Sequence, residues 1–497
     1  MKYNNPIIRG FNPDPSICRV GEDYYLVTST FEYFPAIPVY HSKDLVNWTQ
    51  IGNCIERPEQ LPFEITKVDR GVWAPTIRYY NGKFYVTAKF MEFGNFIVSS
   101  SNPATGWSDP VCVDIGGIDP SILFEDGKAY YCTNHRGEAK QDTISLVEVN
   151  PDTGEMLSEI KPIWHGAAVV ARQYLEAPHI YHVGDWYYVF AAEGGTGKEH
   201  MITVARSRDI WGPYETYENN PILTNYQREE KEVACSGHGD LFEDHNGNWW
   251  VVHLATRPDD AWYSHMGRES FLLPVEWKDE WPVIGDGVSH IECDGPLWNE
   301  QKFSVNWEAD FNSIDVRWLF LRKPSEENYK LKDGHLFLKP STNKISDTEG
   351  SPTFMAIRQP DIECQITVEM NFEPAKDLDE AGLTIYLSSQ GYYSFSKRRE
   401  NSRNYIVIAK NGDSFEPIKT EIPNGKISMR IEADKRKYDF YYSVDGGEYV
   451  LAGSVNVLTV ADAGKCFTGS LIGLFAQCSS DTEAEAEICS FCVAEVM

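Results

Sequence analysis

A short pattern that recurs five times in the first half of the chain constrains its fold more than any other feature. Each copy joins a short apolar strand, usually begun by a proline, through a Gly, Asn or Asp turn to an aromatic strand, which is typical of a β-hairpin. The copies begin at residues 14–17, 74–77, 119–122, 177–180 and, more loosely, 238–241. Successive copies are 45 to 61 residues apart, which is enough for a four-stranded blade. The pattern therefore predicts a five-bladed β-propeller.

The rest of the chain does not carry this pattern. The last copy fades near residues 281–284, and residues 294–306 have the character of a connector. From about residue 310, β-rich segments such as 364–370 and 427–431 are separated by turn signals, which predicts a β-sandwich. We therefore expect an all-β protein with a propeller domain over residues 1–300 and a sandwich domain over residues 308–497.

Charge and composition exclude several classes of partner. The chain has 45 basic and 74 acidic residues and a net charge of −29, which argues against nucleic acid because phosphate binding needs a basic surface. It has no run of about 18 apolar residues, so we expect no membrane span. The first residues show no secretory leader and the 11 cysteines are scattered singly, which favours reduced thiols and a cytoplasmic location.

Acidic residues occur at or beside the start of three of the five repeats. They are Asp14, Asp119 and Glu176. Because the inner strand of each blade lines the central channel, these side chains are expected to converge there. A pair of carboxyl groups is the minimum machinery for glycoside hydrolysis. The alternative is that an aspartate before proline only forms a turn, and the repeats alone leave both interpretations open.

Seven segments in a fixed order resemble the β-xylosidases of glycoside hydrolase family 43. They are residues 10–17, 28–35, 41–48, 72–75, 118–121, 176–179 and 267–270. The resemblance covers nearly the whole chain and implies a concanavalin A-like jelly roll for the sandwich. It implies that Asp14 is the general base, that Glu176 is the general acid and that Asp119 orients the acid and raises its pKa. It also implies inversion of the anomeric centre. One departure is Ala177, where the family usually has glycine.

The same resemblance suggests further site residues. Phe31 and Trp73 correspond to aromatic walls of the sugar pocket, and Arg268 to an arginine that binds sugar hydroxyls. Phe467 corresponds to a phenylalanine that the sandwich contributes to the pocket. Without the resemblance, the aromatic residues would be assigned to core packing and Arg268 to the surface.

The family also bears on metal binding. In the family, the counterpart of His238 lies in the channel, sometimes beside a divalent cation such as calcium, so His238 is a candidate metal ligand. A lone histidine is more often simply hydrogen-bonded inside a protein. No cofactor is expected to be required.

We consider three alternative functions for this chain. The first is an exo-acting, inverting β-xylosidase that releases xylose from the non-reducing end of β-1,4-xylo-oligosaccharides. These small oligosaccharides would be its only necessary partners. The second is an α-L-arabinofuranosidase, or an enzyme with both activities. The third is a sugar-binding propeller without catalysis, which the unequal distribution of acids among the repeats disfavours. The sequence leaves the oligomeric state open, including a homo-oligomer.

One further string is suggestive but incomplete. Residues 194–199 resemble a phosphate-binding loop, but Ala192 replaces the first glycine of that motif and Glu199 replaces its Ser or Thr. We therefore predict no nucleotide site there.

Overall fold

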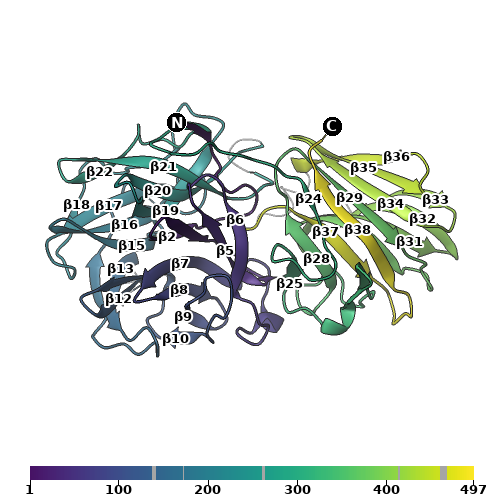
Figure 1. Cartoon of the computed structure of the whole chain (residues 1–497), viewed down its shortest axis with the longest axis horizontal. Coiled ribbons are helices and arrows are strands. Elements are labelled where there is room, and N and C mark those ends of the chain that lie inside the picture. Colours follow the sequence, from purple (N-terminus) through teal and green to yellow (C-terminus); the bar gives the residue numbers. More distant parts are fainter. Residues whose placement is uncertain (137–141, 172, 260–263, 412–414, 459–466, 497) are drawn as a thin grey trace.

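The computed structural model describes residues 1–136, 142–171, 173–259, 264–411, 415–458 and 467–496. The two halves of the chain form two lobes side by side, a propeller from the N-terminal half and a sandwich from the C-terminal half (Figure 1). No helix in the described ranges has the length and apolar character that a membrane span requires. The all-β prediction, with five blades followed by a sandwich, is confirmed.

Five antiparallel four-stranded sheets form the blades, in chain order. Blade I contains β2 (Ser16–Val20), β3 (Asp23–Val27), β5 (Ala36–Ser42) and β6 (Thr49–Ile55). Blade II contains β7 (Val72–Tyr80), β8 (Lys83–Phe90), β9 (Gly94–Ser100) and β10 (Val111–Val113), preceded by the short 3-10 helix η1 (Phe63–Ile65). Blade III contains β11 (Ile118–Glu125), β12 (Lys128–Arg136), β13 (Asp142–Val149) and β14 (Lys161–Trp164). Blade IV contains β15 (Glu176–Val183), β16 (Trp186–Glu193), β17 (Met201–Ser207) and β18 (Glu215–Thr216). Blade V contains β19 (Ala234–Glu243), β20 (Trp249–Thr256), β21 (Glu269–Lys278) and β22 (Trp281–Ile284).

Apolar clusters between neighbouring blades hold the propeller together. Ile97 of blade II and Ile122 of blade III belong to one such cluster, and Ile144 of blade III and Ile180 of blade IV belong to the next. Burying a side chain of this size stabilises the fold by about 1.5–3 kcal/mol. The ring closes where β1 (Lys2–Asn4) pairs with β23 (Glu292–Asp294), which ties the N-terminus to the end of the propeller.

Two large antiparallel sheets form the sandwich. One contains β26 (Tyr329–Lys332), β27 (His335–Leu338), β38 (Ala486–Ala494), β29 (Cys364–Asn371), β34 (Ile427–Ala433), β35 (Lys437–Val444) and β36 (Val450–Asn456), and β24 (Trp307–Glu308) pairs with β38. The other contains β33 (Ile418–Ile422), β32 (Arg403–Lys410), β31 (Gly391–Glu400), β30 (Glu380–Ser388), β37 (Leu471–Gln477), β28 (Thr353–Arg358) and β25 (Leu319–Leu321). The 3-10 helix η2 (Glu326–Asn328) precedes β26. Strands such as β29 alternate buried and partly exposed residues, because only one face of each sheet meets the core.

The boundary between the domains is crossed by one strand. The two-residue strand β4 (Tyr33–Phe34) lies within the propeller segment but pairs with β25 and forms the edge of the second sandwich sheet. Phe34 faces Phe320 and Tyr33 faces Leu321 in this pairing. A single apolar cluster also contains both propeller and sandwich residues, among them Phe34 and Met355. The two domains therefore share both a sheet and a core.

Candidate active site

The inner strands of the five blades share one backbone irregularity at the point where they reach the channel. In each blade a residue other than glycine adopts the left-handed conformation, with φ between 38° and 55°. These residues are Asp14, Ala74, Asp119, Ala177 and His238. In blades II to V the irregularity coincides with a register shift in the ladder, as in a β-bulge, which bends a strand and changes where its side chains point. Such conformations cost about 1–3 kcal/mol each and cluster at functional sites.

Glu176 lies one residue before Ala177, the left-handed residue of blade IV. The residue of blade IV that is equivalent to Asp14 and Asp119 is Ala177, which explains why the family usually has glycine there. Trp73 of blade II and Ile118 of blade III occupy the same position as Glu176, and all three line the same pocket. Two adjacent positions of the repeat therefore supply the site, one with Asp14 and Asp119, the other with Glu176.

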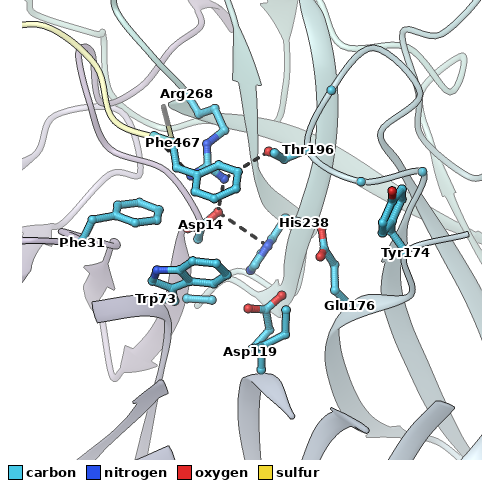
Figure 2. A pocket seen from close by; sticks show the side chains of 15 residues that line it. Asp14, Phe31, Trp73, Asp119, Tyr174, Glu176, Thr196, His238, Arg268 and Phe467 are labelled. Carbon is cyan, nitrogen blue, oxygen red and sulfur yellow. Dashed lines mark hydrogen bonds and ion pairs between the residues drawn. The ribbon is translucent and has the colours of Figure 1, made fainter. Parts of the chain in front are cut away.

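A pocket of about 350 Å³ lies at this end of the channel. All eight residues predicted for the site line it (Figure 2). They are Asp14, Phe31, Trp73, Asp119, Glu176, His238, Arg268 and Phe467. The structure thus brings together every residue that the sequence singled out, including the one from the sandwich. Their catalytic roles stay predictions.

Asp14 is surrounded by groups that stabilise its ionised form. It is 4% exposed and accepts hydrogen bonds from Arg268 Nη1 at 2.9 Å and from Ser29 Oγ at 2.6 Å. His238 Nδ1 lies 3.6 Å from the same carboxylate. Burial alone would raise the pKa of Asp14, but Arg268, His238 and the Ser29 hydroxyl together lower it below its usual value. Asp14 is therefore a carboxylate at neutral pH.

Glu176 and Asp119 experience the opposite influence. Burial, followed by the charges of Asp119 and Asp14, raises the pKa of Glu176 well above its usual value. Burial also raises the pKa of Asp119, and the charge of Asp14 adds to the shift, while His238 opposes it. Asp119 Oδ2 accepts a hydrogen bond of 3.2 Å from the backbone N–H of Ala177, next to Glu176. Asp119 is thus placed to act on Glu176 through both charge and backbone position.

Three aromatic rings and a guanidinium form one wall of the pocket. The Phe467 ring stacks on Phe31 with a centroid distance of 5.8 Å and meets Trp73 edge-on at 5.4 Å. Arg268 lies 5.6 Å from the ring centroids of both Phe31 and Phe467. Phe31 is held by a pair of backbone hydrogen bonds with Val72 and has a left-handed φ of 52°. Figure 2 shows these rings on one side of the pocket, with Glu176 on the other.

His238 does not belong to a group of three protein donors that could hold a metal ion, among the residues that the structure describes. Within the described ranges, the one group of three donors that could hold a metal ion is His335, Glu487 and Cys489, which lies on the sandwich. The role of His238 as a metal ligand therefore stays a prediction, and we derive no catalytic step through a metal.

Three features of the pocket were missed by the sequence reasoning. Ile118 precedes Asp119 at a repeat position that an alignment of the repeats would have found. Residues 194–197, which were considered only as a phosphate loop, line the pocket, and Thr196 Oγ1 accepts a hydrogen bond from Arg268 at 3.2 Å. Tyr174, 46% exposed, also lines it, and Figure 2 shows its ring beyond Glu176, opposite the aromatic wall. Tyr174 and residues 194–197 lie outside the strand segments that recur, so the repeat pattern does not mark them.

The fold and the site together define a class of protein. In one pocket the pKa of Asp14 is lowered, which favours its ionised form, and the pKa of Glu176 is raised, which favours its protonated form. This is the arrangement for acid–base hydrolysis. The chain belongs to glycosyl hydrolases family 43, whose model matches residues 3–282, and residues 308–494 match the β-xylosidase C-terminal concanavalin A-like domain. The protein is a glycoside hydrolase.

Individual relatives extend over nearly the whole chain. A non-reducing end α-L-arabinofuranosidase of Bacteroides ovatus is 38% identical over 95% of this chain and 91% of its own length. A xylosidase/arabinosidase of Butyrivibrio fibrisolvens is 34% identical over 96% of both chains. The crystal structure of a xylan β-1,4-xylosidase from Bacillus halodurans has a TM-score of 0.90 at 29% identity, covering 99% of this chain and 100% of that one.

Proposed function

We propose that the protein is an exo-acting, inverting β-xylosidase that releases xylose from the non-reducing end of β-1,4-xylo-oligosaccharides. The observation that carries the proposal is the opposite shift of two pKa values in one pocket, that of Asp14 downward and that of Glu176 upward. The two shifts favour the protonation state that each role requires, ionised for the base and protonated for the acid. The aromatic wall to which Phe467 contributes supports exo action, because it bounds one side of the sugar site.

In the proposed reaction, Asp14 takes a proton from a water molecule as the water oxygen forms a bond to C1 of the terminal xylose. Glu176 donates its proton to the glycosidic oxygen as the bond from C1 to that oxygen breaks. The products are α-xylose and an oligosaccharide shorter by one unit. Proton exchange with solvent then returns Asp14 to its ionised form and Glu176 to its protonated form. No group beyond these side chains and water enters the scheme.

Arg268 and Asp119 assist in different ways. Arg268 Nη1 binds Asp14 and its Nη2 binds the Phe467 carbonyl, so the guanidinium is fixed in the wall of the pocket, where it can donate to sugar hydroxyl groups. Asp119 adds the negative charge that helps to keep the Glu176 proton in place. The reaction thus depends on three acidic residues. Asp14 and Glu176 act on water and substrate, and Asp119 acts through Glu176.

A second candidate is supported by the comparison with known proteins. The Bacteroides ovatus relative is named an α-L-arabinofuranosidase, and the Butyrivibrio relative carries both names. A terminal arabinofuranose and a terminal xylose present similar hydroxyl groups to one small pocket, so we propose that the protein accepts both to some degree. None of the ten cysteines in the described residues is in a disulfide, which supports action in the reducing cytoplasm.

One set of assays tests these proposals together. Hydrolysis of xylobiose, nitrophenyl β-xyloside and nitrophenyl α-L-arabinofuranoside is measured under the same conditions, and the larger kcat/KM identifies the main activity. Proton NMR of the xylobiose reaction should show α-xylose appearing first. If β-xylose appears first, the inverting assignment is wrong and Asp14 does not act as the base. If only the arabinofuranoside is cleaved, the second candidate replaces the first.

A further inference from the structure

The sandwich reaches the pocket through Phe467, and the propeller holds the main chain of this residue on both sides. The backbone N–H of Phe467 donates to Asp69 Oδ1 at 2.7 Å, and its carbonyl accepts from Arg268 Nη2 at 3.1 Å. The next residues lie directly against the propeller. Ser470 N–H donates to the His265 carbonyl at 2.8 Å, and a Cβ on Gly469 would lie 2.2 Å from the Met266 carbonyl oxygen. The position of the Phe467 ring is therefore set by propeller groups.

Asp69 contacts two of the three aromatic residues of the wall. Its carboxylate binds the backbone of Phe467, and its own carbonyl accepts a hydrogen bond of 3.0 Å from Trp73 Nε1. It lies between η1 and β7 with a left-handed φ of 60°. This conformation lets the side chain and the carbonyl of one residue serve two different partners. Neither the repeat pattern nor any motif in the sequence marks Asp69.

Asp69 is itself held in place by a hydrogen bond to Glu32. Its N–H donates to Glu32 Oε2 at 3.2 Å, and Glu32 is completely buried directly after Phe31. Burial, followed by the charge of Asp69, raises the pKa of Glu32 to about 8. The backbone of Glu32 in turn accepts a hydrogen bond of 3.0 Å from Arg322 N–H of the sandwich. Asp69 therefore sits at a point where both domains and all three wall residues meet.

We propose that Asp69 is a positioning residue that holds Phe467 in the sugar pocket and so sets the affinity for the terminal sugar. Within the described residues it makes no hydrogen bond with Asp14, Asp119 or Glu176, so its loss should act on binding far more than on the chemical step. The kinetic part of this inference rests on the glycosidase function proposed above.

The test compares Asp69→Ala and Asp69→Asn with a matched control. Gln50→Ala is the control, because Gln50 Nε2 donates at 2.7 Å to the Val316 carbonyl and so also links propeller to sandwich, but away from the pocket. Losing a hydrogen bond to a charged group should raise KM for xylobiose by about tenfold in Asp69→Ala, with kcat changed by less than about twofold. Asp69→Asn keeps an acceptor oxygen and should recover most of the affinity. Gln50→Ala should leave both constants unchanged.

A double-mutant cycle separates positioning from a general loss of stability. If Asp69 acts through Phe467, Asp69→Ala should add little to the KM of Phe467→Ala. If the two effects multiply, or if Asp69→Ala lowers the melting temperature without changing KM, the proposal is wrong.

Hydrogen exchange tests the inference independently of activity. The amide of Phe467 should exchange at least about tenfold faster in Asp69→Ala than in the wild-type protein or in Gln50→Ala, because its acceptor has been removed. Unchanged exchange at Phe467 would overturn the proposal. Should the wild-type protein cleave none of the pentosides, the proposed function fails, while the exchange experiment still decides whether Asp69 holds Phe467.

Discussion

The propeller and the sandwich contribute to the same pocket in very different ways. The propeller supplies all of the acidic groups from one backbone feature that is repeated five times, whereas the sandwich supplies one phenylalanine from a segment that occurs once. Repetition places charged groups from distant parts of the sequence around a common axis. The sandwich bounds one side of the pocket through Phe467. The difference suggests that the chemistry belongs to the propeller and that the recognition of a chain end depends on both domains.

Removing the sandwich is the most severe way to test this division. A chain that ends at Asn306 leaves β4 without β25 and exposes the propeller side of the shared apolar cluster. We expect this truncated protein to be insoluble or unfolded, as judged by soluble yield and thermal melting of its circular dichroism signal. A soluble propeller with unchanged kinetic constants on xylobiose would show that the sandwich is an accessory and that Phe467 has no part in the site.

A substitution at Glu176 should separate chemistry from recognition. Glu176→Gln cannot donate a proton, so kcat/KM on xylobiose should fall by about 10²–10⁴-fold. The loss should be much smaller for a substrate with an activated phenol, since that leaving group needs no proton. Steady-state kinetics on both substrates check this, and an equal loss on both would remove Glu176 from the acid role.

A substitution at Phe467 tests the contribution of the sandwich alone. Phe467→Ala removes a ring that contacts both Phe31 and Trp73, so binding should weaken by about 1–3 kcal/mol, or roughly 5- to 150-fold in KM for xylobiose. Thermal melting should confirm that the fold is kept. A change in kcat with no change in KM would contradict a role in recognition.

The smallest effect is expected from a change of charge within the propeller. Asp119→Asn keeps an acceptor for the Ala177 N–H but removes a negative charge that raises the pKa of Glu176. The pKa of Glu176 should therefore fall, and the alkaline limb of the kcat/KM profile should move to lower pH by about one unit. The acid limb, which reports the ionisation of Asp14, should move much less. A shift of the alkaline limb to higher pH would show that Asp119 does not act on Glu176 through its charge.

The parts of the molecule that repeat were predictable from the sequence, and the parts that occur once were less so. The blades and the three acids followed from the recurrence of one pattern, including the offset of Glu176, which lies one position before the equivalent of Asp14. Phe467 was found by family resemblance alone. No sequence pattern marked Asp69, Tyr174 or the transfer of β4 to the sandwich. Asp69 and β4 depend on contacts between segments hundreds of residues apart, and Tyr174 lies outside the strand segments that recur.

Because β4 pairs with β25, the sheet that contains both strands cannot be completed until β25 has been synthesised. Phe34 leaves the ribosome 286 positions before its partner Phe320. At about 5–20 residues per second, this strand waits roughly 15–60 s for its neighbour, with its edge free to pair with other chains. Because β4 is only two residues long, it presents few backbone groups to a wrong partner during that interval. The shortness of the strand thus limits the risk of misassembly while the second half of the enzyme is being made.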